Sequence, residues 1–191
     1  MIQIVFGTIA FGLFILSDWL GYKTKSSKYM FLFYLGGILL VGATFVCIPI
    51  REFVLNLKNI LLGIMALLSL FMLIYSVFFA LDKGDDKGDE NELLPLTDTG
   101  VYAACRHPGV IFLCLFYLCL YGVFTHKSLF ICLCFFSIYD IFYVIWQDVF
   151  LFEKTIEGYA SYKERTPFLL PTVGGVKNCV AYLYKKHQRK G

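Results

Sequence analysis

Two long stretches without a single charged residue constrain this chain more than any other feature. Residues 29–50 and residues 60–81 each run for 22 positions without Lys, Arg, Asp or Glu. A helix of that length is about 33 Å long, enough to cross a hydrocarbon core of about 30 Å. Hydrophobic residues make up 59% of the chain and charged residues 16%, against roughly 45–50% and 25% in soluble domains. The composition excludes a disordered chain, a disulfide scaffold and a nucleic-acid-binding protein, and it indicates an integral membrane protein.

Three further apolar segments, residues 2–20, 109–125 and 128–146, complete the predicted membrane region. The first and the last carry one acidic residue each, Asp18 and Asp140, and the middle one is uncharged but short. We therefore predict an all-α integral membrane bundle of about five transmembrane helices. The fourth and fifth helices would form a tight hairpin, or the fourth would be partly re-entrant. No basic residue precedes the first segment, so we expect a retained helix rather than a cleaved signal peptide.

Basic residues predict the orientation of the bundle. If the N-terminus lies outside, the cytoplasmic segments are 22–28, 82–108 and 151–191, and these hold 14 of the 17 Lys and Arg residues. Short cytoplasmic loops of membrane proteins are enriched in Lys and Arg. We therefore expect the N-terminus outside and the C-terminus in the cytoplasm, with the 82–108 loop and the tail on one face. The compact size and the lack of a targeting signal fit a bacterial inner membrane, and the endoplasmic reticulum is the alternative location.

The chain divides into three regions: residues 1–93 with three spans and an acidic cytoplasmic loop, a candidate functional region at 94–176, and a basic tail at 177–191. Within the loop, residues 82–92 are expected to be a solvated linker, because their acids lack the ligand pattern of a calcium loop. A short amphipathic segment is expected near the C-terminus. The seven cysteines lie mostly within predicted spans, and no zinc-type spacing of Cys or His occurs, so we predict no metal.

An Arg–His–Pro sequence stands where the fourth span enters the membrane. The segment around it reads Thr99-Gly-Val-Tyr-Ala-Ala-Cys-Arg-His-Pro108. Proline suits the first turn of a helix, and an arginine can extend toward lipid headgroups. The alternative is that Arg106 and His107 are held at the cytoplasmic interface to bind an anionic or proton-bearing group of a ligand, since polar groups beside apolar spans are costly in lipid.

A second polar group lies near the end of the fifth span. Asp140, Tyr143 and Gln147 are spaced i, i+3 and i+7, so they are expected to share one helical face. Asp148 follows directly. In a membrane helix such a stripe is expected to face protein or a cavity rather than lipid.

Two tyrosines, Tyr159 and Tyr162, follow on a short amphipathic stretch that ends at the proline-bracketed segment 166–171. Alone they would indicate an interfacial helix anchored by aromatic residues. The chain carries, in this order, the pattern GxYxxxRHP at 100–108, one helical hairpin, an acidic position and YxxY. This order of features resembles the isoprenylcysteine carboxyl methyltransferase family. These are integral membrane enzymes that use S-adenosyl-L-methionine and are related to phospholipid methyltransferases. The resemblance covers about residues 94–176, which would then be the methyltransferase core.

The resemblance implies a pocket for S-adenosyl-L-methionine on the cytoplasmic side. Arg106 or His107 would bind the methionine carboxylate, Asp148 would bind the ammonium or a ribose hydroxyl, and Tyr102 or Tyr159 would contact the sulfonium. The implied acceptor is lipophilic, of isoprenylcysteine carboxylate type or lipid type, and would enter from the bilayer beside Asp140 and Tyr143. No catalytic base is evident. The implied cofactor-binding residues are Leu94, Pro95, Leu96, Thr97, Tyr102, Arg106, His107, Pro108, Gly109, Val110, Gln147, Asp148, Tyr159 and Tyr162.

Some positions differ from the family pattern. The acidic pair is Gln147 and Asp148 rather than two glutamates, and no Lys or Arg lies between Lys127 and Lys154 to hold a substrate carboxylate. The identity of the acceptor therefore stays open. Two alternatives remain beside the enzyme: a catalytically silent membrane scaffold of the same fold and, less favoured, a small transporter-like bundle that uses its intramembrane acids.

Overall fold

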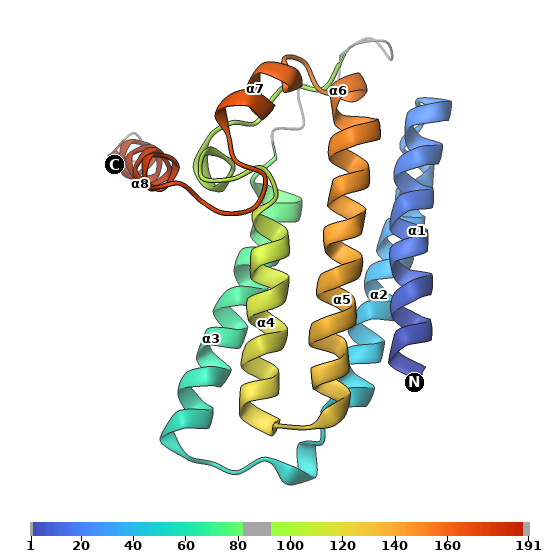
Figure 1. The fold of residues 1–191 in the computed structure, drawn as a ribbon, viewed down its shortest axis with the longest axis vertical. Helices are drawn as coiled ribbons and strands as arrows, with labels where there is room; N and C mark the ends of the chain where they lie inside the picture. Colours follow the sequence, from blue (N-terminus) through green and yellow to red (C-terminus); the bar gives the residue numbers. More distant parts are fainter. Residues whose placement is uncertain (1, 82–92, 189–191) are drawn as a thin grey trace.

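The computed structural model describes residues 2–81 and 93–188, which form an upright bundle of helices with a smaller cap at one end (Figure 1). The prediction of an all-α bundle is confirmed. The predicted linker at 82–92 lies outside the described residues. The bundle consists of α1 (Ile2–Thr24), α2 (Met30–Cys47), α3 (Leu57–Ile74), α4 (Pro108–Phe124) and α5 (Lys127–Trp146).

Four of the described helical segments are long and apolar enough to cross a membrane, by length and composition. α4 has 17 residues and is shorter, about 25 Å, but it is one continuous helix packed between α3 and α5 rather than a re-entrant turn. Many large apolar side chains are exposed on the outside of the bundle, which suits contact with lipid acyl chains. The protein is a multi-pass helical membrane protein. The four longer segments are Ile2–Thr24, Ser27–Cys47, Leu57–Phe79 and Lys127–Thr155.

α5 lies in the middle of the bundle, with α1 and α2 on one side and α3 and α4 on the other (Figure 1). Phe136 of α5 is fully buried against Tyr117 of α4, with ring centroids 5.3 Å apart. Gly36 allows α2 to approach α1 closely, because a Cβ there would lie 2.7 Å from the Phe14 ring and 2.8 Å from the Ala10 carbonyl oxygen. Small residues at helix contacts are typical of packing in membranes.

Hydrogen bonds between helices also hold the bundle together. On α1, Asp18 Oδ2 accepts a hydrogen bond from the Tyr143 hydroxyl at 2.7 Å and another from Gln147 Nε2 at 2.8 Å. The hydroxyls of Thr44 on α2 and Tyr117 on α4 lie 2.6 Å apart. Lipid offers these groups no partner, so they bond to one another. The acid near the end of the first span is thereby accommodated, and α1 continues past the predicted end at residue 20 to residue 24.

Local signals set two helix boundaries that the hydrophobic pattern alone did not. α3 begins at Leu57, three residues before the predicted start, because the Asn56 side chain accepts a hydrogen bond from the backbone N–H of Asn59 at 2.8 Å. α3 and α5 each continue as a π-helical turn, η3 (Tyr75–Phe79) and η5 (Gln147–Leu151). The fifth span therefore extends well beyond the predicted end at residue 146.

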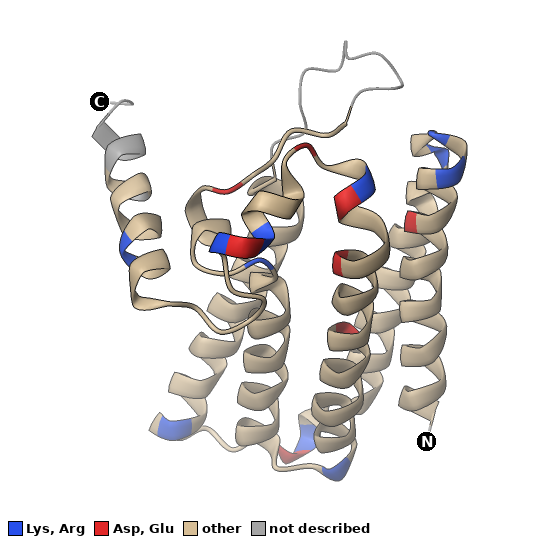
Figure 2. Ribbon diagram, turned by 45° about the horizontal axis from the view of Figure 1, so that its top comes forward, with Lys and Arg blue, Asp and Glu red and all other residues tan. Residues whose placement is uncertain are grey.

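The cap contains short helices from two parts of the chain. Its elements are η4 (Gly100–Ala103), α6 (Phe152–Thr155), α7 (Tyr159–Arg165) and α8 (Val173–Gln188). The segment before α4 and the chain after α5 lie at the same end of the bundle (Figure 1), as expected for two segments that flank a pair of spanning helices. Most of the described Lys and Arg residues also lie toward this end (Figure 2).

Candidate functional site

The candidate site is built around the buried carboxylate of Asp148. Its Oδ1 accepts a hydrogen bond from the Tyr159 hydroxyl at 2.5 Å and lies 3.2 Å from Arg106 Nε and 3.3 Å from His107 Nε2. Its Oδ2 lies 3.4 Å from Lys163 Nζ. The side chains of Asp148 and Arg106 are only 6% and 8% exposed. Because water screens such buried charges weakly, their interactions are stronger than those of surface pairs. We call these five residues the Asp148 cluster.

Backbone hydrogen bonds fix the Arg–His–Pro segment against the chain that follows α7. The N–H of Arg106 donates to the Pro167 carbonyl at 2.9 Å, and the N–H of His107 donates to the Phe168 carbonyl at 3.2 Å. The Phe168 ring lies edge-on to the His107 imidazole at 4.9 Å and 5.5 Å from Cζ of Arg106. Pro108 is the first residue of α4, a position that proline favours. Both polar side chains are therefore held in an aromatic environment.

Tyr143 and Gln147 of the predicted stripe both face α1, whereas Asp148, which directly follows the stripe, faces the cap. Asp148 joins the cluster, whereas its neighbour Gln147 donates to Asp18 together with Tyr143 and holds α1 against α5. Both residues lie in η5, and consecutive residues of a helix point in different directions, so they reach different partners. Asp140 is half-buried, and its carboxylate makes no hydrogen bond within the described part of the chain.

Three tyrosines support the cluster. The Tyr162 hydroxyl donates to the Tyr102 carbonyl at 2.7 Å, and the Tyr102 hydroxyl donates to the Ser76 carbonyl at 3.0 Å. The rings of Tyr159 and Tyr162 pack edge to face with centroids 5.7 Å apart. Burial raises the pKa of all three hydroxyls well above the usual value near 10. The tyrosines therefore stay protonated and act as hydrogen-bond donors.

Burial also sets the charge of the neighbouring groups. It lowers the pKa of His107 below 6.5, although the nearby Asp148 carboxylate opposes this shift, so the imidazole is neutral at pH 7. Burial raises the pKa of the Cys105 thiol to about 11, and a protonated thiol is not an effective nucleophile. The carboxylate thus faces two permanent cations, Arg106 and the partly exposed Lys163. Lys163 also pairs with the carboxylate of Glu153 at 2.9 Å, so the two cations and the two carboxylates balance in charge.

The guanidinium of Arg106 has unused hydrogen-bonding capacity. Its Nη1 donates to the Lys163 carbonyl at 2.9 Å. Its Nε is buried and, although it lies 3.2 Å from Asp148 Oδ1, it forms no hydrogen bond with any described residue. A buried donor without a partner costs roughly 1–3 kcal/mol. A carboxylate of a ligand that reached this atom would remove that cost.

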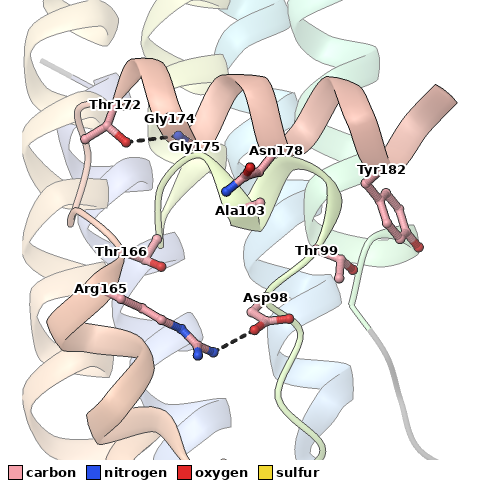
Figure 3. Close-up of a pocket in the computed structure, with 10 residues that line it drawn as sticks. All are labelled: Asp98, Thr99, Ala103, Arg165, Thr166, Thr172, Gly174, Gly175, Asn178 and Tyr182. Atoms are coloured by element: carbon pink, nitrogen blue, oxygen red, sulfur yellow. Dashed lines mark hydrogen bonds and ion pairs between the residues drawn. The ribbon is translucent and has the colours of Figure 1, made fainter. Parts of the chain in front are cut away.

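A cavity of about 530 Å³ lies between α8, the segment before α4 and the end of α7 (Figure 3), and no residue of the Asp148 cluster lines it. Such a volume is within the roughly 300–1,000 Å³ that small-molecule sites occupy. Asp98 and Arg165 form an ion pair of 2.6 Å on its wall, and the buried Thr166 lies beside them. The lining residues are Asp98, Thr99, Ala103, Arg165, Thr166, Thr172, Gly174, Gly175, Asn178 and Tyr182.

The structure brings together only part of the predicted cofactor set. Leu94 lies nearby: its N–H donates to the Thr155 carbonyl at 2.8 Å, and its carbonyl accepts the N–H of Glu157 at 3.0 Å. Pro95, Leu96 and Thr97 lie in the sequence between Leu94 and Asp98, the first residue that lines the cavity. The predicted residues that belong to the Asp148 cluster or support it are Tyr102, Arg106, His107, Asp148, Tyr159 and Tyr162.

The other predicted positions lie within helix contacts. Val110 is buried in the core of the bundle, and Gly109 faces α3, where a Cβ would lie 3.6 Å from Ser76 Oγ. Gln147 is bonded to Asp18. None of the fourteen predicted residues lines the cavity.

Some residues of the site were missed from the sequence. Phe152 stacks on His107 with centroids 6.0 Å apart, and nothing in its neighbours distinguishes it from a lipid-facing phenylalanine. Lys163 stands next to Tyr162 but carries no pattern of its own. Asp98 and Thr99 directly precede the GxYxxxRHP pattern, so an extension of that pattern by two residues would have reached the cavity.

The fold and the site define a multi-pass helical membrane protein that has a buried polar cluster and a separate cavity at the same end of the bundle. Comparison of the chain with models of known families, with curated proteins and with solved structures finds no match. Among residues 2–81 and 93–188, no three His, Cys, Asp or Glu side chains are grouped so that they would hold a metal ion. The function is therefore argued from the site itself.

Proposed function

We propose that this protein is a membrane-embedded methyltransferase that uses S-adenosyl-L-methionine and acts on a lipophilic acceptor. The observation that carries the proposal is the Asp148 cluster, where Arg106 and His107 meet Asp148 and Tyr159 from the other side of a helical hairpin. These are positions that the resemblance to isoprenylcysteine carboxyl methyltransferases implies for cofactor binding. In the orientation we propose, the N-terminus lies outside and this end of the bundle faces the cytoplasm of a bacterial cell, where the cofactor is available.

The donor set fits the charged part of the cofactor. The buried Nε of Arg106, which lacks a hydrogen-bond partner among the described residues, suits a carboxylate. The rings of Phe152, Tyr159 and Phe168 surround the same place, and aromatic faces attract a sulfonium cation. The cavity of about 530 Å³ at the same end of the bundle offers room for the nucleoside.

When bound, S-adenosyl-L-methionine supplies an electrophilic methyl group for an in-line displacement. The residues of the chain bind, orient and exclude water, which is where most of the acceleration of such a reaction arises. Asp148 acts as a positioning residue, because it holds the guanidinium of Arg106 in place. The neutral His107 presents its Nε2 to the same carboxylate oxygen, Oδ1, as Arg106 and Tyr159.

We propose that the acceptor reaches the cluster from its membrane side. Asp140 and Asp148 are eight residues apart on the fifth span, or about 12 Å along a helix. A lipophilic acceptor that enters from the bilayer would pass Asp140 and Tyr143 before it reached the cluster. A carboxylate or thiolate acceptor needs no general base, whereas an amine or alcohol would.

The test is equilibrium binding of S-adenosyl-L-methionine or its demethylated product to the protein in nanodiscs. We expect saturable binding by the parent and about tenfold weaker binding by Asp148→Asn, since the amide loses the charge that holds Arg106. Glu153→Gln is the matched control: this carboxylate is 45% exposed, pairs with Lys163, and its loss is expected to leave affinity unchanged. If Asp148→Asn does not fold, Tyr159→Phe removes a hydrogen bond to the same carboxylate. A parent protein without measurable binding in detergent and in nanodiscs would refute the proposal.

Methyl transfer distinguishes the enzyme from a catalytically silent scaffold of the same fold, which would bind the cofactor without turnover on a membrane lipid extract. A transporter-like bundle would bind no cofactor. That alternative relied on the intramembrane acids, and Asp18 is accounted for structurally by the two hydrogen bonds that it accepts from the fifth span.

A further inference from the structure

The outer face of α8 is an apolar stripe that no described part of the chain covers. The side chains of Val173, Val176, Val180 and Tyr184 are 74%, 45%, 60% and 66% exposed. At about 100° per residue these four positions fall on one face of a helix. Exposed apolar residues that are aligned in this way mark an interaction surface rather than a face in contact with water.

The opposite face of α8 packs against η4, another element of the cap, and this contact fixes the rotation of the helix. Gly175 lies so close to η4 that a Cβ there would be 2.6 Å from the Ala103 carbonyl oxygen. The ring of Tyr182 lies 3.7 Å from the position that a Cβ on Gly100 would take. At the start of the helix, the N–H of Gly175 donates to Thr172 Oγ1 at 3.1 Å. The apolar stripe is therefore held pointing away from the protein.

The direction of α8 suits a membrane surface. Figure 1 shows α8 nearly end-on while α1 to α5 stand upright, so α8 runs across the spanning helices rather than along them. A helix that crosses the end of a transmembrane bundle lies parallel to the bilayer plane, which is the arrangement of interfacial amphipathic helices.

The charge of this segment suits an anionic surface. Residues 173–191 contain five Lys and Arg and no Asp or Glu. Lys177 lies beside the apolar stripe and is exposed. Basic residues next to an apolar helical face are attracted to anionic lipid headgroups, with a gain of about 1 kcal/mol for each residue near the surface.

We infer that α8 docks on the anionic lipid surface at this end of the bundle, with its valine stripe in the headgroup region. The inner face of the same helix lines the cavity through Gly174, Gly175, Asn178 and Tyr182. Contact between α8 and lipid would therefore hold one wall of the cavity in place. If α8 left the membrane, the cavity would change shape. This inference does not depend on methyl transfer.

The test places a tryptophan on α8 in nanodiscs whose lipids carry brominated acyl chains, which quench nearby indoles. Val180→Trp lies on the stripe, and Ala181→Trp, one residue further and also exposed, is the matched control. The parent already contains two tryptophans, so its fluorescence is subtracted from that of each variant before the quenching of the added tryptophan is calculated. We expect about twofold more quenching at position 180 than at position 181 in nanodiscs with anionic lipid, and a smaller difference in purely zwitterionic nanodiscs.

Equal quenching at the two positions, or quenching that does not depend on anionic lipid, would overturn the inference. A second copy of the chain could cover the stripe instead of lipid. In that case the tryptophan at position 180 would be shielded from both brominated lipid and aqueous acrylamide, and chemical cross-links would join two copies. This result would also overturn the inference. Both substituted residues are exposed, and thermal unfolding of each variant verifies that the bundle remains folded.

Discussion

The loss of stability in Arg106→Ala measures how strongly the buried Asp148 carboxylate depends on its arginine partner. Both side chains are less than one tenth exposed. Breaking a buried ion pair and leaving one charge behind costs about 3–5 kcal/mol. In Arg106→Ala the remaining carboxylate keeps the hydrogen bond from Tyr159 and the partly exposed contact with Lys163. We therefore expect a loss near the lower end of that range, about 3 kcal/mol.

Thermal unfolding in a mild detergent measures this loss. For a protein of 191 residues, 1 kcal/mol corresponds to about 2–4 °C in Tm, so Arg106→Ala should lower Tm by about 6–12 °C. Arg165→Ala is the matched control, because Arg165 and Asp98 form an ion pair in which the side chains are 55% and 41% exposed. Exposed pairs contribute about 0–1 kcal/mol, so the control should shift Tm by no more than about 4 °C.

Equal small shifts for the two arginine variants would refute the reasoning, since they would mean that water reaches the Asp148 carboxylate. A double variant sharpens the test. Arg106→Met combined with Asp148→Leu replaces the pair with apolar side chains of similar size, and such replacements are often nearly neutral. We expect the double variant to be more stable than Arg106→Ala, whereas strict additivity of the single losses would indicate that the two side chains do not interact.

Three further predictions follow from other contacts. Tyr143→Phe removes the hydrogen bond to Asp18 and should cost about 1 kcal/mol in thermal unfolding; an unchanged Tm would contradict that contact. Gly36→Ala should cost about 1–3 kcal/mol because its Cβ would clash with α1, whereas Gly37→Ala, where a Cβ meets nothing within 4 Å, should not reduce Tm. His107 has a lowered pKa in the folded state, so only the unfolded chain gains a proton as the pH falls below about 6.5. Stability should therefore decrease from pH 7.5 to 5.5, and His107→Gln should remove that part of the decrease when Tm is measured against pH.

The spanning helices could be predicted because lipid allows little else. An apolar run of about 20 residues must form a helix in order to satisfy its own backbone groups, so the apolar segments predicted the bundle. The errors at the helix ends were small except in the fifth span, which continues to Thr155 instead of residue 146. The error at the start of α3 came from the Asn56 cap, a local signal that a count of hydrophobic residues does not include. The shared end of the two functional segments followed from the number of spans between them.

The details of the site could not be predicted in the same way. The pairing of Arg106 with Asp148 was open to prediction as two polar groups at one end of a hairpin, because buried charges require partners. The bond of Gln147 to Asp18 was not, because helix geometry separates the directions of Gln147 and Asp148 but does not indicate which helix packs against each face. The cavity escaped prediction because α8, which forms one of its walls, packs through glycines and a tyrosine that have no distinctive spacing in the sequence.

Helix α7 links the Asp148 cluster to the cavity, because it contributes a residue to each of them. Lys163 contacts Asp148 with its side chain and accepts a hydrogen bond from Arg106 with its carbonyl. Two residues later, Arg165 reaches across the cavity wall to Asp98. A change in the charge of Asp148 would therefore free α7 to move. The shape of the cavity would then change although the substituted residue does not line it. For this reason a loss of ligand binding in Asp148→Asn has to be compared with Asp98→Asn, which acts on the cavity wall alone: a ligand held by the cluster responds mainly to the first substitution, and a ligand held only by the cavity responds to both.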